Sequence, residues 1–267
     1  MNIENPEFKI HRLDSVESTN KHCEALDLAQ VEDFTCYWAL EQTAGIGQRG
    51  NHWHSSPGKN LTFSLVLHPT FLPAARQFLL TQALSLGVVD MIEGIDRRDG
   101  TERVGKSAAA KPTPSIHSCL FIKWPNDIYL AGGKVCGTLV STRLQGDCIA
   151  SAVCGIGLNI NEREFPEWVP HPTSLSLTTG KEYDLEFLLH RLLGCLHQRY
   201  LLLKSGHEPQ EEYLSRLMNL GVEARYLYHN EEIRATITGV DPFGHLLLTA
   251  ADGRHLRCAM KEIVFLS

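Results

Sequence analysis

The sequence lacks the features that mark several specialised classes of protein. Its 267 residues include eight cysteines but no C-x-x-C pair, so we expect no zinc ribbon. No apolar run approaches the roughly 20 residues that span a bilayer, and the mixed, polar N-terminus is not a secretory signal. These absences predict a cytoplasmic protein with reduced thiols and no membrane association.

An excess of positive charge is also absent. The chain has 25 Lys and Arg against 31 Asp and Glu, which gives a formal net charge of −6. A chain that is negative overall is a poor candidate for a general nucleic-acid binder. Its hydrophobic fraction of 43% and charged fraction of 21% are typical of a soluble globular protein.

The spacing of apolar residues predicts a mixed α/β (α+β) fold. Short or alternating apolar runs predict strands, and apolar residues at helical spacing predict helices. Expected strands are residues 11–16, 36–42, 61–67, 120–124, 128–130, 134–143 and 148–160. Expected helices are residues 19–29, 73–92, 185–204 and 211–219.

The pattern changes in two places along the chain. Residues 97–118 have almost no large apolar side chains, which predicts a flexible, solvated insertion. From residue 221 onward, five short alternating runs separated by turns predict a small β-barrel. We therefore expect a larger domain at residues 1–220 and a small C-terminal domain at residues 221–267.

One phosphate-binding pattern is best rejected. Residues 100–107 read GTERVGKS and fit the P-loop pattern letter for letter. A P-loop lies at a turn from a strand into a helix, where backbone N–H groups surround a phosphate. Here charged residues precede Gly100, and Pro112 and Pro114 follow closely, so a P-loop NTPase is retained only as an alternative.

A glycine-rich segment reads GIGQRGNHW. Its glycines, Gly45, Gly47 and Gly50, free the backbone to surround an anion. Arg49 can add a bidentate phosphate contact, and Trp53 offers a flat face to a ring. The segment differs from a dinucleotide fingerprint, because no strand–helix crossover opens at it. Taken alone, the segment is more typical of a flexible surface hairpin than of a phosphate-binding loop.

Three further segments place polar groups at strand ends. KWPND carries Lys123 and Asn126, and we interpret Asp127 as stabilising the turn through its own backbone. GGKVCGTLV begins a strand with Lys134, whose ammonium can meet an anion close to the backbone; an edge lysine that prevents aggregation is the alternative. GIGLNIN ends a strand with two glycines and two amides, where ligands can approach.

These segments, preceded by Ser18-Thr19-Asn20, occur in the order seen in biotin–protein ligases. The resemblance covers about residues 11–179 and, more weakly, the C-terminal barrel. It implies a mixed-sheet catalytic domain of the biotin/lipoate ligase type with an SH3-like β-barrel. It also implies a two-step reaction: biotin and ATP, with Mg²⁺, give biotinyl-5′-AMP, and the biotinyl group then passes to one lysine of a biotin carboxyl carrier protein domain.

The resemblance also implies a role for individual residues. Lys134 and Lys123 would be catalytic, with Lys134 beside the carboxylate and the α-phosphate. The biotin site would contain Ser18, Thr19, Asn20, Gln42, Gly45, Ile46, Gly47, Gln48, Lys134 and Gly137. The nucleotide site would contain Arg49, Gly50, Trp53, Lys123, Asn126 and Asn159. No protein-bound metal is expected, since His52 and His54 lack a third ligand in sequence.

The sequence departs from the family in its glycine-rich loop. Ile46 and Gln48 occupy two positions that are often arginine in such ligases, so we hypothesise that the enzyme holds its adenylate less tightly. The few residues before the first strand cannot form a three-helix DNA-binding unit, so we expect a monomer or homodimer without a repressor role. A lipoate or octanoyl ligase and a non-catalytic biotin or nucleotide sensor remain alternatives.

Overall fold

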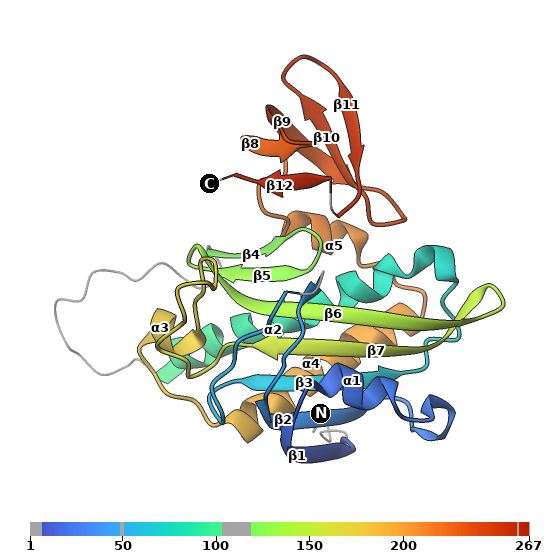
Figure 1. Ribbon diagram of the computed structural model, residues 1–267, viewed down its shortest axis with the longest axis vertical. Helices are drawn as coiled ribbons and strands as arrows, with labels where there is room; N and C mark the ends of the chain where they lie inside the picture. The colour runs from blue at the N-terminus through green and yellow to red at the C-terminus, as the bar shows by residue number, and fades with distance from the viewer. Residues whose placement is uncertain (1–6, 49–50, 103–118, 261, 267) are drawn as a thin grey trace.

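The computed structural model describes residues 7–48, 51–102, 119–260 and 262–266. Its larger sheet has seven strands in the order β1-β2-β3-β7-β6-β5-β4 (Figure 1). β1 and β2 are parallel and the other neighbouring pairs are antiparallel, so the sheet is mixed, as predicted. The strands are β1 (Ile10–Val16), β2 (Thr35–Gln42), β3 (Leu61–Leu67), β4 (Leu120–Lys123), β5 (Asp127–Leu130), β6 (Gly133–Gln145) and β7 (Cys148–Leu158).

Helices lie on both faces of this sheet. In Figure 1, α2 (Phe78–Glu102) and α4 (Leu185–Lys204) pack together behind it, and α1 (Thr19–Glu24) lies in front, over β3 and β7. The other helical segments are short. They are α3 (Leu175–Thr179), α5 (Gln210–Ser215) and the 3₁₀ turns η1 (Leu28–Gln30) and η3 (Ala74–Arg76).

The first predicted helix is too long by one turn. α1 ends at Glu24, because Asp27 accepts a hydrogen bond from the backbone N–H of Ala29 and begins a separate 3₁₀ turn. The predicted helix at residues 185–204 is confirmed, whereas the one at residues 211–219 is observed only over α5.

The second helix is longer than predicted. α2 continues to Glu102, so the beginning of the expected flexible insertion is helical, and that boundary was wrong. No proline occurs between Pro73 and Pro112, so nothing in the local sequence stops the helix earlier. Gly100 therefore lies inside a helix and does not follow a strand, which agrees with rejecting a P-loop. Residues 103–118 lie outside the described residues.

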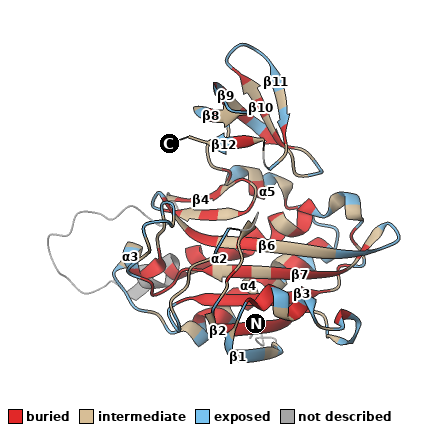
Figure 2. Ribbon diagram, in the orientation of Figure 1, coloured by how far each residue is buried: buried red, intermediate tan, exposed pale blue. Residues whose placement is uncertain are grey.

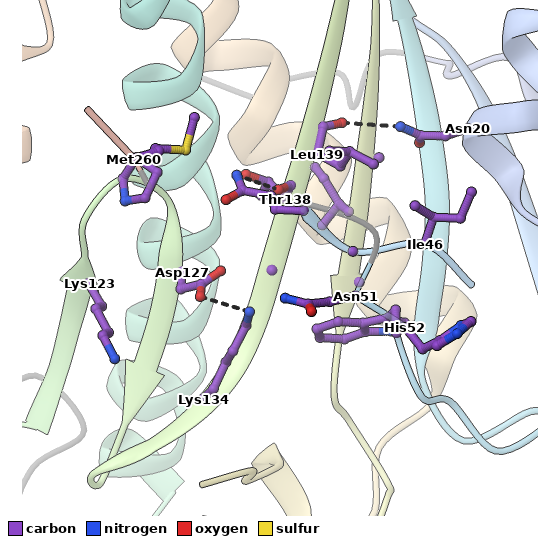
Figure 3. A pocket seen from close by; sticks show the side chains of 18 of the residues that line it. Asn20, Ile46, Asn51, His52, Lys123, Asp127, Lys134, Thr138, Leu139 and Met260 are labelled. Atoms are coloured by element: carbon purple, nitrogen blue, oxygen red, sulfur yellow. Dashed lines mark hydrogen bonds and ion pairs between the residues drawn. The ribbon is translucent and has the colours of Figure 1, made fainter. Parts of the chain in front are cut away.

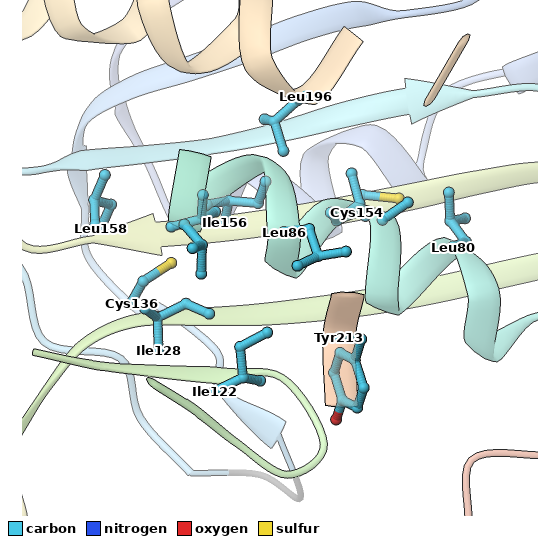
Figure 4. Close-up of a cluster of buried hydrophobic side chains, with 14 of the residues drawn as sticks. Leu80, Leu86, Ile122, Ile128, Cys136, Cys154, Ile156, Leu158, Leu196 and Tyr213 are labelled. Carbon is cyan, nitrogen blue, oxygen red and sulfur yellow. The ribbon is translucent and has the colours of Figure 1, made fainter. Parts of the chain in front are cut away.

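The hydrophobic core lies between the sheet and the pair α2 and α4. β3 is buried along its whole length, and buried residues concentrate on the central strands (Figure 2). In Figure 4, Leu80 and Leu86 of α2 and Leu196 of α4 lie against Cys154 and Ile156 of β7. This burial supplies most of the stabilising apolar surface and fixes the sheet from behind.

One helix satisfies the length and hydropathy requirements of a membrane span, contrary to the sequence-based expectation. The segment Ala74–Ile95 does so, but 83% of its most apolar window is buried inside the protein. Its apolar side chains therefore belong to the hydrophobic core of the protein. The eight cysteines all lie within the described residues and form no disulfide with one another; their reduced state stays a prediction.

The C-terminal strands form a second, antiparallel sheet in the order β11-β10-β9-β8-β12, as predicted for an SH3-like barrel. They are β8 (Glu223–Tyr228), β9 (Glu231–Val240), β10 (Leu246–Ala250), β11 (His255–Cys258) and β12 (Ile263–Phe265). Trp124 Nε1 donates to the carbonyl of Gly244 at 3.0 Å, which ties the end of β4 to this sheet. The hydroxyl of Tyr213 donates to the carbonyl of Pro125 at 2.8 Å and holds α5 to the same turn.

Two helical glycines provide a test of how closely α2 and α4 pack. A Cβ on Gly87 of α2 would lie 2.9 Å from Leu196 Cδ2 and 3.1 Å from Leu196 Cα, whereas a Cβ on Gly194 of α4 would meet nothing within 4 Å. We expect Gly87→Ala to destabilise the protein by about 1–3 kcal/mol, because the helix axes must separate.

Gly194→Ala is the matched control, and it is expected to stabilise by up to about 1 kcal/mol through helix propensity. Chemical denaturation monitored by circular dichroism measures both effects. Equal stability of the two variants would contradict the close packing of α2 against Leu196.

Candidate active site

A cavity of about 270 Å³ lies between α1, the loop after β2, the strands β6 and β7, and the C-terminal sheet. Figure 3 shows Asn20, Lys123, Asp127 and Lys134 around it. It brings together eleven of the predicted site residues from distant parts of the chain. They are Ser18, Thr19, Asn20, Gln42, Ile46, Gly47, Gln48, Trp53, Lys123, Lys134 and Gly137.

One end of the cavity is polar but uncharged. Ser18, Thr19 and Asn20, at the start of α1, are each at least 95% buried. The backbone N–H of Thr19 donates to Gln42 Oε1 at 2.8 Å, and Asn20 Nδ2 donates to the carbonyl of Leu139 at 3.3 Å (Figure 3). Such a group of amides and hydroxyls suits a neutral ligand head with both donors and acceptors.

Glycines on β7 form the floor of the cavity. A Cβ on Gly155 would lie 2.0 Å from Asn20 Oδ1, and a Cβ on Gly157 would lie 2.3 Å from Trp53 Cε2. On β6, a Cβ on Gly137 would lie 3.1 Å from the Trp53 ring. The Asn20 amide and the Trp53 ring can therefore rest on the sheet only because these positions have no side chain. Trp53 Nε1 is buried there, and it has no hydrogen-bond partner in the part of the chain that the structure describes.

The other end of the cavity carries two ammonium groups. Lys134 Nζ lies 2.8 Å from Asp127 Oδ2 and 5.8 Å from the centre of the Trp53 ring. Lys123 Nζ lies 5.2 Å from the ring of Phe265. Burial lowers the pKa of Lys123; the carboxylate of Asp127 opposes this shift and the charge of Lys134 adds to it. This end suits an anionic ligand group.

The structure corrects the interpretation of Asp127 as a turn residue. Its carboxylate holds the ammonium of Lys134, which enters β6 across a register irregularity in the pairing with β5. Sequence reasoning missed this pair because the two residues are seven positions apart and meet only after β5 and β6 pair. The ion pair orients Lys134 while leaving it at the cavity wall.

The glycine-rich loop begins as a narrow hairpin. The backbone N–H of Gly47 donates to the carbonyl of Asn51 at 2.7 Å, and the N–H of Trp53 donates to the carbonyl of Gly45 at 2.9 Å. Gln48 Nε2 donates to Asn126 Oδ1 at 3.0 Å. The neutral Gln48 side chain thus connects this loop to the KWPND turn.

Five predicted residues are not seen lining the cavity. Arg49 and Gly50 lie outside the described residues. The side chain of Asn126 lies behind the wall, donating to the carbonyl and hydroxyl oxygens of Thr138 at 2.9 and 2.8 Å. Asn159 Nδ2 donates to the carbonyl of Thr173 at 3.0 Å. Gly45 lies at the base of the hairpin, where a Cβ would be 2.6 Å from the carbonyl oxygen of Trp53.

Several cavity residues were not predicted. The C-terminal strand β12 and its approach contribute apolar side chains, and no local sequence signal places that sheet over the cavity. Ser64 of β3 is fully buried and contacts Thr19 and Asn20 of the cavity wall, and its signal was a serine in the otherwise largely apolar run LTFSLVL. Gly155 and Gly157 of the GIGLNIN segment line the cavity, where the sequence predicted that ligands can approach. The lining residues that had no individual role in the sequence-based assignment are Asn51, His52, Phe63, Trp124, Pro125, Asp127, Thr138, Leu139, Ile156, Met260, Ile263, Val264 and Phe265.

No metal centre is built into the described part of the chain. Among residues 7–48, 51–102, 119–260 and 262–266 there is no group of three or more His, Cys, Asp or Glu that could hold an ion. His54 Nε2 lies 4.0 Å from Glu162 Oε2, and His52 lines the cavity as a single residue.

The fold combines a mixed sheet with a second, antiparallel sheet. Its cavity has neutral amides at one end and ammonium groups at the other, which is the arrangement of an α/β protein of the acyl-ligase type. Residues 13–159 match the model of the biotin/lipoate A/B protein ligase family, and the chain belongs to this family.

Within the family the chain is similar to biotin ligases. It is 30% identical to the bifunctional ligase/repressor BirA of Bacillus spizizenii over 90% of this chain and 69% of that protein. It is 29% identical to a biotin–[acetyl-CoA-carboxylase] ligase of Paracoccus denitrificans over 90% and 94% of the two chains. The fold matches a biotin protein ligase from Aquifex aeolicus in complex with biotin and ATP, with a TM-score of 0.72, 26% identity and coverage of 96% and 97%.

Substitution of one floor glycine tests the geometry of the site. We expect Gly157→Ala to displace the Trp53 ring, because the new Cβ would overlap it, and to shift the tryptophan emission toward that of an exposed indole. Gly239→Ala on β9 is the matched control, since a Cβ there meets nothing within 4 Å. Identical emission spectra for the two variants would show that Trp53 does not rest on β7.

Proposed function

We propose that this protein is an ATP-dependent biotin–protein ligase. It activates biotin as biotinyl-5′-AMP and transfers the biotinyl group to a lysine of a biotin carboxyl carrier protein domain. The observation that supports this most is the polarity of the cavity at α1, β6 and β7: its uncharged end suits the ureido head of biotin, and its cationic end suits a carboxylate and phosphates. Membership of the family and similarity to named biotin ligases support the same reaction.

The first step joins two anions, and the cationic end accounts for it. A biotin carboxylate oxygen attacks the α-phosphorus of ATP, the bond to the bridging oxygen breaks, and pyrophosphate leaves. Lys134, held by Asp127, would neutralise charge on the carboxylate and the α-phosphate in this step. Lys123 would neutralise negative charge on the phosphates of the nucleotide. Mg²⁺ fits as an ion brought by ATP, because phosphate oxygens are its preferred ligands in such sites.

The second step uses a reactive mixed anhydride. The ε-amine of the acceptor lysine attacks the acyl carbon, AMP leaves, and the amine loses a proton. Water would compete with that amine, so the site benefits from an apolar rim. The side chains of Met260, Ile263, Val264 and Phe265 supply such a rim from the C-terminal sheet.

The direct test uses the full chain with biotin, ATP, Mg²⁺ and a biotin carboxyl carrier protein domain. We expect the intact mass of the acceptor to increase by one biotinyl group. Lys134→Ala should reduce the rate at least about 100-fold, because a charge-stabilising group is lost. Lys204→Ala, at the exposed end of α4, is the matched control and should leave the rate unchanged.

Each alternative has its own outcome in this experiment. Labelling by lipoate in place of biotin would favour a lipoate ligase. Binding of biotin without release of pyrophosphate would favour a sensor. Full transfer by Lys134→Ala would overturn the catalytic assignment of that residue.

The hydrogen bonds of Gln48 support the proposal that the adenylate is held less tightly than in an arginine-rich relative. Its neutral amide already donates to Asn126 and brings no charge to a phosphate. We expect Gln48→Arg to slow dissociation of biotinyl-AMP roughly tenfold, because a charge-assisted contact replaces a neutral one. Single-turnover release measurements test this, with Gln30→Arg on the exposed η1 turn as a charge-matched control. A release rate equal to that of the control would refute the idea.

The wider organisation follows the same proposal. We propose residues 1–220 as the catalytic unit and residues 221–267 as the small C-terminal domain. The carrier domain is the proposed protein partner, and a cytoplasmic monomer or homodimer without DNA binding stays a prediction. Size-exclusion chromatography with light scattering measures the oligomeric state.

A further inference from the structure

We infer that Ser64, which does not line the cavity, sets the donor and acceptor polarity of the uncharged end and so determines selectivity for a cyclic urea. This inference rests on the proposed function, since it concerns the head-group end of that same site. Ser64 lies at the centre of β3 and is fully buried. Burying a hydroxyl costs free energy of folding unless the hydroxyl is hydrogen-bonded, so the hydrogen-bond partners of Ser64 indicate its role.

Ser64 contacts two residues of the cavity wall. Its Oγ lies 2.6 Å from Asn20 Oδ1 and 2.7 Å from Thr19 Oγ1. Asn20 Nδ2 donates to the carbonyl of Leu139 at 3.3 Å, which turns Oδ1 toward Ser64, and this oxygen accepts the Ser64 proton. Because Ser64 has a single proton, the Thr19–Ser64 contact is then made with the Thr19 proton, which turns away from its other acceptor, Gln42 Oε1 at 3.2 Å. The backbone of Thr19 supplies the proton that Gln42 Oε1 accepts at 2.8 Å.

This order of donors fixes how the Asn20 amide is oriented. With Oδ1 held by Ser64, Nδ2 points to the carbonyl of Leu139 at 3.3 Å, as Figure 3 shows. Rotating the amide by half a turn would bring two oxygens together at Leu139, and Ser64 would then accept from Nδ2 and donate to Thr19, which reverses the order of donors. Gly155 makes room for the carboxamide, because a Cβ there would lie 2.0 Å from Oδ1. The orientation is therefore determined by hydrogen bonds and not by shape alone.

The result is a defined pattern for a ligand head. The second N–H of Asn20 Nδ2 and the amide nitrogen of Gln42 remain as donors on residues that line the cavity. The oxygen of Thr19, once its proton is committed to Ser64, offers lone pairs as an acceptor. A cyclic urea presents one carbonyl acceptor between two N–H donors, which complements this set. A guanidine-type head, with a third N–H in place of the carbonyl, would face the Asn20 and Gln42 donors with another donor.

The test compares biotin with 2-iminobiotin, whose ureido carbonyl is replaced by an imino group. Isothermal titration calorimetry gives the two dissociation constants. We expect Ser64→Ala to weaken biotin binding about tenfold and to reduce the preference for biotin over 2-iminobiotin about tenfold, because Asn20 loses one of the two hydrogen bonds that orient its amide and Thr19 loses the acceptor of its proton. At saturating biotin and ATP, kcat should stay within about twofold, since Ser64 lies away from the ammonium groups.

Ser85→Ala on α2 is the matched control. Ser85 is also fully buried, and its hydroxyl has no hydrogen-bond partner within the described residues. It should leave both the affinity for biotin and the preference over 2-iminobiotin unchanged. Ser85→Ala shows the effect of removing a buried hydroxyl that does not contact the cavity wall, whereas the proposed role changes the preference only in Ser64→Ala.

A folded Ser64→Ala protein that keeps the wild-type preference would overturn the inference. If that variant does not fold, Asn20→Asp carries the test, because it replaces the proposed donor with an acceptor and should favour 2-iminobiotin. An unchanged preference in Asn20→Asp would also overturn the inference. Failure of the unmodified protein to bind biotin would instead reject the proposed function.

Discussion

The site depends on the absence of side chains at two positions in the middle of the sheet. Gly155 and Gly157 of β7 leave open the space into which Asn20 and Trp53 descend, one from the start of α1 and one from the glycine-rich loop. Any Cβ at these positions would overlap those groups at 2.0–2.3 Å. The sheet itself, fixed from behind by α2 and α4, therefore serves as the floor on which segments from distant parts of the chain meet.

The cavity separates two kinds of chemistry by placing neutral groups at one end and charged groups at the other. Near α1 the groups are neutral amides and hydroxyls, and their hydrogen bonds to one another fix which atoms remain available to a ligand. Near β5 and β6 the groups are ammonium ions, one of them held by Asp127 and the other partly desolvated against Phe265. A ligand with a neutral head and an anionic end can be oriented in only one direction by such a cavity.

The second sheet contributes to the site as well as extending the fold. Its strand β12 adds Ile263, Val264 and Phe265 to the wall, and Trp124 donates to the carbonyl of Gly244 across the junction. Lys123 thus lies between the two sheets, and the burial that lowers its pKa comes partly from the aromatic ring of Phe265. The cationic end of the cavity is complete only when both sheets are in place.

The sequence by itself determined the mixed α/β class, the small β domain after residue 220 and the set of motifs that meet at the cavity, because apolar periodicity and turn residues are local signals. Eleven of the residues it singled out line one cavity. Tertiary structure alone decided the pairing of Asp127 with Lys134, the coverage by Phe265 and the role of Ser64, since each depends on strand pairing or sheet packing between distant residues. Local sequence also could not indicate where α2 ends, because no helix-breaking proline lies near residue 97 and the helix continues to Glu102. Helices and strands are determined by residues close together in the sequence. The polarity of a binding site is determined by buried hydrogen-bonding groups that are distant in the sequence and that the fold brings into contact.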